Sequence, residues 1–222
     1  MNRKTKLEII FLSALFFFTV AFVALLVIVQ WPEWWMWVIF ERTPMTWFES
    51  ILLYTTTLLA FGVAGVEFLT SALKNSLLWA GYAVGFLFLT LDERFAIHER
   101  VRDSVLIPND IHPGIFFWTS PGDYILVTMA FFAIALVPVY YKLFAIRKSA
   151  LILKGVGFGF ALVAVFLDSL HVTDLAMDTQ RLLQFCEEIV ETVAMVLFCS
   201  SLFLIFMDKL QLGSEKVSER QF

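Results

Sequence analysis

The chain has 222 residues, of which 60% are hydrophobic and only 16% are charged, and its mean hydropathy is +0.82. A soluble domain is closer to half apolar and a quarter charged, so this composition excludes an ordinary soluble domain and indicates a membrane protein. The net charge of −4 is small, and the sequence has no basic patch interleaved with aromatic residues, which excludes a nucleic-acid partner.

Long apolar runs predict an all-α, polytopic membrane protein that forms a single domain over residues 1–222. A helix needs about 20 mostly apolar residues to cross the hydrocarbon core of a membrane. Runs of this kind follow one another along the chain, separated by short polar or proline-containing connections. We expect six transmembrane helices, over residues 7–29, 48–73, 76–103, 123–145, 149–173 and 182–207. The polar residues 208–222 are expected to form a frayed tail.

Tryptophan is concentrated after the first of these runs. Five of the seven tryptophans lie within residues 30–47, and Pro32 ends the preceding helix. Tryptophan rings prefer the membrane–water interface, where the ring is buried and the N–H stays hydrated. We therefore expect a short interfacial segment here, which serves either as an aromatic belt alone or as a rim that gathers lipid.

The distribution of positive charge predicts that both termini are cytoplasmic. Loops rich in Lys and Arg stay on the cytoplasmic side of a membrane. With the N-terminus inside, 11 of the 16 Lys and Arg residues fall on that side, and six spans return the C-terminus to it. The expected location is the inner (plasma) membrane of a bacterium.

Acid and imidazole groups gather at the outer ends of three predicted helices. The segment 91–100 carries four of them within eight residues, and similar groups recur at Asp168 with His171 and at Glu187–Glu191. Ionisable groups inside a membrane cost a few kcal/mol or more and are by default functional. Counted at about 1.5 Å per residue from the cytoplasmic ends, all of them reach the outer leaflet or its surface. We expect them to form one site on the periplasmic side.

Helical geometry indicates which of these groups share a face. Pairs three residues apart do so; these are Glu188 with Glu191 and Asp168 with His171. Asp92 and Glu99 align within about 20°, whereas His98 lies about 120° from Asp92 on a straight helix. Either His98 faces elsewhere, or the helix unwinds near the membrane surface. Whether Glu187 or Glu188 faces the site stays open.

Carboxylates combined with two imidazoles are typical of two-metal sites in helical bundles, where about four carboxylates and two histidines face inward. Clustered carboxylates repel one another unless a cation neutralises them. The carboxylate-rich set favours Fe or Mn as the divalent metal, with Zn possible. The predicted metal ligands are Asp92, His98, Glu99, Asp168, His171, Glu188 and Glu191.

The sequence thus predicts a metal-dependent membrane enzyme that acts on a lipid or another hydrophobic small molecule. Two-metal redox chemistry is favoured, and Zn-dependent hydrolysis of a lipid amide or ester is the alternative. Glu188 and Glu99 are the predicted catalytic acid–base groups. An ion- or proton-coupled transporter or a non-catalytic sensor is the alternative from another class. Ion pairing between these acids and nearby arginines would be a purely structural explanation.

Three further ionisable residues carry weaker signals. Glu49, at the outer start of the second span, and His112, in a proline-rich loop, are candidates for additional ligands. Glu67 lies near the inner end of the second span and is expected to pair with Lys74.

Two glycine spacings suggest close helix approach. Gly81 with Gly85, and Gly155 with Gly159, have the four-residue spacing that lets membrane helices come together. We therefore expect the third and fifth spans to converge there.

Overall fold

The computed structural model describes residues 3–40, 42–70, 73–109, 111, 124–170 and 175–219, with side chains except at 124 and 216–219. Within these ranges the chain contains helices and no strand, which confirms the predicted all-α fold. The helices are α1 (Arg3–Val29), α2 (Pro44–Thr70), α3 (Leu73–Phe95), α4 (Ile97–Val101), α5 (Tyr124–Phe144), α6 (Lys148–Asp168) and α7 (Met177–Glu219). A π-helical turn, Arg102–Leu106, follows α4.

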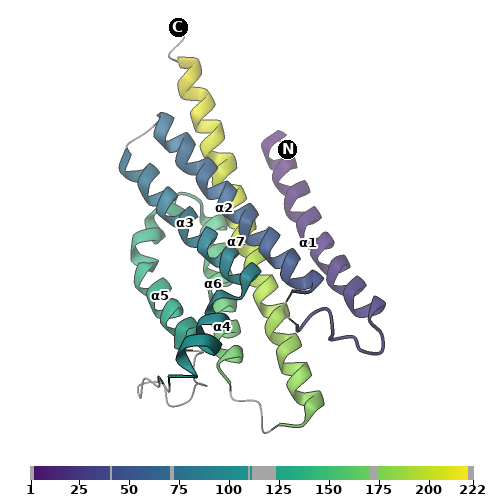
Figure 1. Ribbon diagram of the computed structural model, residues 1–222. Coiled ribbons are helices and arrows are strands. Elements are labelled where there is room, and N and C mark those ends of the chain that lie inside the picture. Colours follow the sequence, from purple (N-terminus) through teal and green to yellow (C-terminus); the bar gives the residue numbers. More distant parts are fainter. Residues whose placement is uncertain are drawn as a thin grey trace.

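Among the described residues, five helices are long and apolar enough to cross a membrane: α1, α2, α5, α6 and α7. They fit a multi-pass membrane protein. The remaining long helix, α3, has 23 residues but carries Lys74 in its first turn and Asp92, Glu93 and Arg94 in its last, which lower its hydropathy. The long helices run alternately up and down, so both termini lie at one end of the bundle and α4 lies at the other (Figure 1).

Two predicted boundaries are wrong. The helix expected over 76–103 is broken at Ala96, where φ is 47° and ψ is 52°, in the left-handed region. The last helix, expected over 182–207, is α7 and extends beyond both of those limits, into the expected polar loop and through most of the expected tail. Polar contacts hold the extension, because Asp208 binds Arg147 and Lys209 pairs with Glu67.

The apolar core lies where α2 packs against both α3 and α7, and α7 packs in turn against α6. Aromatic residues fill much of it. The ring of Trp79 is 5.2 Å from that of Phe144, and the ring of Phe86 is 5.5 Å from that of Phe198, between centroids. Lys154 of α6 enters this core and donates a hydrogen bond to the hydroxyl of Tyr82.

The Trp-rich segment forms a run of turns over residues 30–40 rather than a helix. Val38 is buried with Leu26 of α1 and Met45 of α2. The ring of Trp34 meets that of Phe185 in α7 edge to face, at 5.0 Å. The segment therefore packs against three helices near the end of the bundle where α4 lies.

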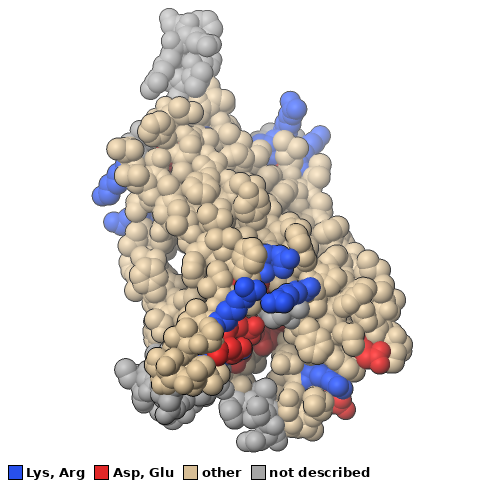
Figure 2. Space-filling view, in the orientation of Figure 1, with Lys and Arg blue, Asp and Glu red and all other residues tan. Residues whose placement is uncertain are grey.

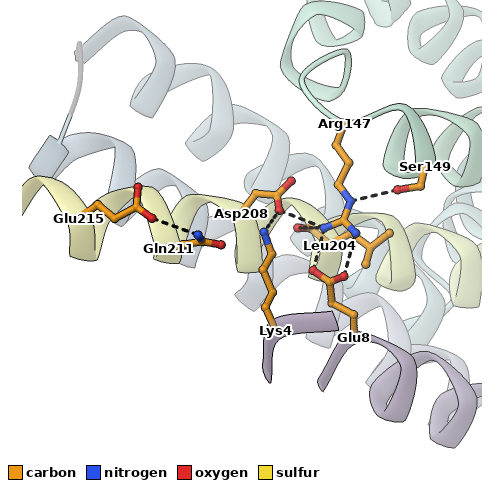
Figure 3. Close-up of polar contacts among 8 residues, drawn as sticks. All are labelled: Lys4, Glu8, Arg147, Ser149, Leu204, Asp208, Gln211 and Glu215. Atoms are coloured by element: carbon orange, nitrogen blue, oxygen red, sulfur yellow. Dashed lines mark hydrogen bonds and ion pairs between the residues drawn. The ribbon is translucent and has the colours of Figure 1, made fainter. Parts of the chain in front are cut away.

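A polar cluster joins α1 to α7 through the connection between α5 and α6 (Figure 3). The guanidinium of Arg147 binds both carboxylate oxygens of Glu8 at 2.8 Å and Oδ1 of Asp208 at 3.0 Å. Lys4 also pairs with Asp208. Bidentate pairing of this kind fixes geometry as well as charge, so the cluster sets how α1 docks.

The glycine spacings do not mark close helix contacts. A Cβ atom built on Gly85, Gly155 or Gly159 would meet nothing within 4 Å, and one on Gly81 would meet only the Tyr140 hydroxyl, at 3.7 Å. Close approach occurs instead at Gly157, where a Cβ would lie 3.0 Å from Cβ of Leu197. The expectation that α3 and α6 converge at these spacings is therefore wrong, and the tight contact joins α6 to α7.

Candidate functional site

The break at Ala96 creates the first part of the site. With Ala96 in the left-handed conformation, the chain changes direction, and α4 begins beside the end of α3. Oδ1 of Asp92 accepts the backbone N–H of His98 at 2.8 Å, and Oδ2 lies 2.8 Å from Nδ1 of the same imidazole. Asp92 is only 5% exposed. The second explanation for His98, a helix that unwinds near its end, is therefore confirmed.

His98 lies in α4, beyond the end of α3, and is surrounded by negative charge. Burial disfavours its charged form, but the hydrogen bond and charge of Asp92, with the charges of Asp168 and Glu99, outweigh burial and raise the pKa of His98 above its ordinary value of 6.5. The interaction with Asp168 brings the end of α6 into the same site. Because Nδ1 faces Asp92, Nε2 is the nitrogen left to meet a substrate or a metal.

Glu99 lies in a different place from the one its spacing suggested. The helix break ends the alignment of Asp92 with Glu99, which held only on a straight helix. Oε1 of Glu99 accepts a hydrogen bond from Arg102 at 3.1 Å, and Arg102 also binds Asp103 at 2.9 Å. Glu99 therefore lies in an ion-paired group beside His98, which agrees in part with the structural explanation by ion pairing.

The second part of the site is a group of acids around Glu49. This side chain of α2 is 1% exposed and accepts a hydrogen bond from Oγ1 of Thr192 in α7 at 2.6 Å. It interacts electrostatically with Glu93 of α3 and with Glu188 and Glu191 of α7. Acids on α3 and α7 thus act electrostatically on this buried carboxylate, and Glu188 of the 187–188 pair is one of them.

Sequence reasoning gave Glu49 too little weight because it stands at a helix start. A stronger signal was available in its spacing. Glu49 shares a helix face with Leu52, Leu53 and Thr56, the i, i+3, i+4, i+7 pattern of a buried face. All four side chains are buried. An acid on the buried face of a membrane helix is a strong candidate for function.

Two arginines lie over tryptophan rings. The guanidinium of Arg94 lies 4.4 Å from the ring centroid of Trp47, and that of Arg181 lies 3.9 Å from the ring centroid of Trp35. Figure 2 shows acidic side chains gathered on one face with basic side chains along the border. Two tryptophans of residues 30–47 thus contact arginines of α3 and α7.

Two of the candidate histidines, His171 and His112, lie outside the described residues. Across the ranges that the structure does describe, no three His, Cys, Asp or Glu side chains are grouped so that they could hold one metal ion. The other predicted ligands fall into the two neighbouring groups around His98 and Glu49. The metal centre therefore stays a prediction.

Comparison with known proteins identifies the family. Residues 14–206 match the family described as Domain of unknown function (DUF8692). The chain belongs to the DUF8692 family. No curated protein and no solved structure matches it.

The DUF8692 match contains every residue of both groups, from Glu49 in α2 to Thr192 in α7. It also contains Arg147, whereas its partners Glu8 and Asp208 lie outside the matched residues. The two acid groups thus lie wholly within the matched region. The cluster that docks α1 lies only partly within it.

Proposed function

We propose that this DUF8692 chain is an integral membrane enzyme that acts on a lipid or another amphiphile at the break between α3 and α4. The contact between Asp92 and His98 is the observation that carries the proposal. A carboxylate on Nδ1 fixes the ring and its tautomer, so that Nε2 can exchange a proton with a substrate or bind a metal. Glu99 and Glu188 are the proposed further acid–base groups.

The proposed topology adds α3 to the five apolar helices, which gives six spans. The alternating direction of the helices supports it, since α3 lies beside α2 and runs in the opposite sense (Figure 1). In this topology both termini are cytoplasmic and the site faces the periplasm. The turns over residues 30–40, with their tryptophans, lie at the outer interface.

A divalent metal, with Fe or Mn favoured over Zn, is the proposed cofactor. Its support is the electrostatic repulsion that Glu93, Glu188 and Glu191 exert on the carboxylate of Glu49, which a bound cation would relieve. His98 Nε2 and Asp168 would complete a mixed ligand set. Because no three of the described donors meet at one point, we assign no catalytic step to the metal.

Lipid turnover tests the enzymatic proposal. Wild-type protein in nanodiscs is incubated with bacterial membrane lipids, and mass spectrometry follows substrates and products. We expect His98→Gln and Asp92→Asn to lower turnover by about 100-fold or more, the range of a lost general base. Glu215→Gln, at the far end of α7, is the control and should match wild type. Turnover unchanged in His98→Gln would contradict the assignment.

Metal content is a separate test. The detergent-purified protein is measured by elemental analysis beside Glu188→Ala and His171→Ala. Two Fe or Mn ions per chain, lost in both variants, would support redox chemistry. One Zn ion per chain would support hydrolysis of a lipid amide or ester. No stoichiometric metal in the wild type would end the metal proposal and leave acid–base chemistry by His98.

A proton- or ion-coupled transporter is the second candidate. Buried ionisable groups occur toward both ends of the bundle, with Glu49 beside Thr192 near one end and Glu67 beside Lys209 near the other. A transporter needs such groups in both leaflets. In proteoliposomes that enclose a pH-sensitive dye, proton flux that is lost in Glu49→Gln would favour this function. If vesicles that contain the wild-type protein took up protons no faster than empty vesicles, this function would be excluded.

A further inference from the structure

A cavity of about 650 Å³ lies at the end of the bundle opposite His98, where α2, α3, α5 and α7 meet. One wall is apolar and consists of Leu78 and Trp79 of α3 with Pro138 and Val139 of α5. Pro138 lies inside α5, where a proline removes one backbone hydrogen bond of the helix. The cavity is large enough for a phospholipid headgroup and the first part of its chains.

The carboxylate of Glu67 lines this cavity and is only partly satisfied. Glu67 is 2% exposed, and its Oε1 pairs with Lys209 rather than with the expected Lys74. Its Oε2 is buried and has no hydrogen-bond partner. A buried acceptor without a donor is costly, so native structures fill such positions. The atom is therefore placed to accept a hydrogen bond from a ligand that carries an N–H or O–H group.

The remaining charged lining is basic. Lys74 and Lys142 are exposed at the cavity, and neither forms an ion pair with another of the described residues. With Lys209 and Glu67 the lining carries three positive charges and one negative charge. A bound group should therefore present an anion to Lys74 and Lys142 and a donor to Glu67.

We propose that this cavity binds a phospholipid whose headgroup joins a phosphate to a hydrogen-bond donor, with phosphatidylethanolamine as the best match. The phosphate meets Lys74 and Lys142, the ammonium donates to Oε2 of Glu67, and the acyl chains follow the apolar wall. Basic pockets between membrane helices on the cytoplasmic side bind lipid headgroups in this manner. The site is separate from the proposed enzymatic site and does not depend on it.

The full-length protein in detergent tests this by native mass spectrometry with two lipids of identical chains. Phosphatidylcholine has the same phosphate, but its quaternary ammonium has no N–H. Wild type should bind phosphatidylethanolamine about tenfold more tightly, as one charge-assisted hydrogen bond predicts. Equal binding of the two lipids would overturn the proposal, and this comparison requires no variant.

Variants assign the contacts. Glu67→Gln should reduce the preference for phosphatidylethanolamine toward parity. Lys142→Ala and Lys74→Ala should weaken both lipids severalfold while the preference remains, and Lys148→Ala, an exposed lysine outside the cavity, should change neither. A preference that survives Glu67→Gln would remove that residue from the site. Displacement of bound lipid by the same concentration of inorganic phosphate would show a site for a free anion instead.

Discussion

Alanine rarely adopts the left-handed backbone found at position 96, and the whole arrangement of Asp92 and His98 depends on it. The conformation costs an L-residue about 1–2 kcal/mol, which the two hydrogen bonds to Asp92 and the packing of α4 must offset. On a continuous helix His98 would point away from Asp92. The break therefore converts two poorly aligned residues into a contacting pair.

Replacing Ala96 by glycine should stabilise the protein. Glycine adopts positive φ without steric cost, although it gains more entropy on unfolding, so the expected net gain is about 0.5–1 kcal/mol. The same substitution at Ala80, in the middle of α3, should instead destabilise by about 1 kcal/mol. Both effects are measured as shifts in thermal unfolding in detergent. A less stable Ala96→Gly variant would mean that the backbone is helical at this position.

The Asp92–His98 pair should make stability depend on pH. The folded state raises the pKa of His98 above 6.5, so the contribution of the charged pair is complete below pH 6.5 and is lost as pH rises through the folded pKa. The groups that face this imidazole are Asp92, Asp168 and Glu99. In metal-free buffer, we expect wild type to melt at a higher temperature than His98→Gln. This difference should be largest at low pH. A difference in melting temperature that grew as pH rose would contradict a charged Asp92–His98 pair.

These two residues show where sequence reasoning stops. Burial of Asp92 followed from its place in an apolar run, and the need for a distorted helix followed from the angle to His98. The position of the break did not follow, because residues 94–98 contain neither glycine nor proline to mark it. Tertiary contacts, and not local preference, choose the left-handed residue.

At the scale of helices, the close contact between α6 and α7 gives a direct test of the fold. Gly157 lies against Leu197 and the ring of Phe198, where a Cβ would approach to 3.0–3.1 Å. Gly157→Ala should therefore destabilise by about 1–3 kcal/mol, the usual cost of overpacking. Gly155→Ala, two residues away and facing open space, should be neutral or stabilising because alanine favours helix. Equal melting temperatures for the two variants would contradict this packing.

The helices were largely predictable from hydropathy, but their ends were not. Hydropathy located all six long helices within a few residues at most ends. It ended the last one at 207 because the following residues are polar. In the folded chain Asp208 pairs with Arg147, and Lys209 pairs with Glu67. These ion pairs allow polar residues to continue the helix. Lys209 lies in the segment expected to form a frayed tail, which is why the sequence predicts Lys74 and not Lys209 as the partner of Glu67.

At the scale of the whole molecule, the shared end of the two termini makes the topology testable. A cysteine introduced in the loop after α4 should react with an impermeant thiol reagent on intact cells, and one introduced near residue 215 should react only after the cells are opened. The native Cys186 and Cys199 are first replaced by serine and alanine. The reverse pattern would invert the orientation and move the site to the cytoplasmic side.

The cluster at Arg147 has a consequence for how the protein is made. Lys4 and its partner Asp208 are 204 residues apart, so α1 leaves the ribosome long before α7, the helix on which it docks. Until α7 is made, α1 lacks its main packing partner, and the insertion machinery or the bilayer must hold it as a separate helix. When ribosomes are stalled before Asp208, α1 should therefore crosslink to the translocation channel. After release of the full chain, this crosslinking should be lost.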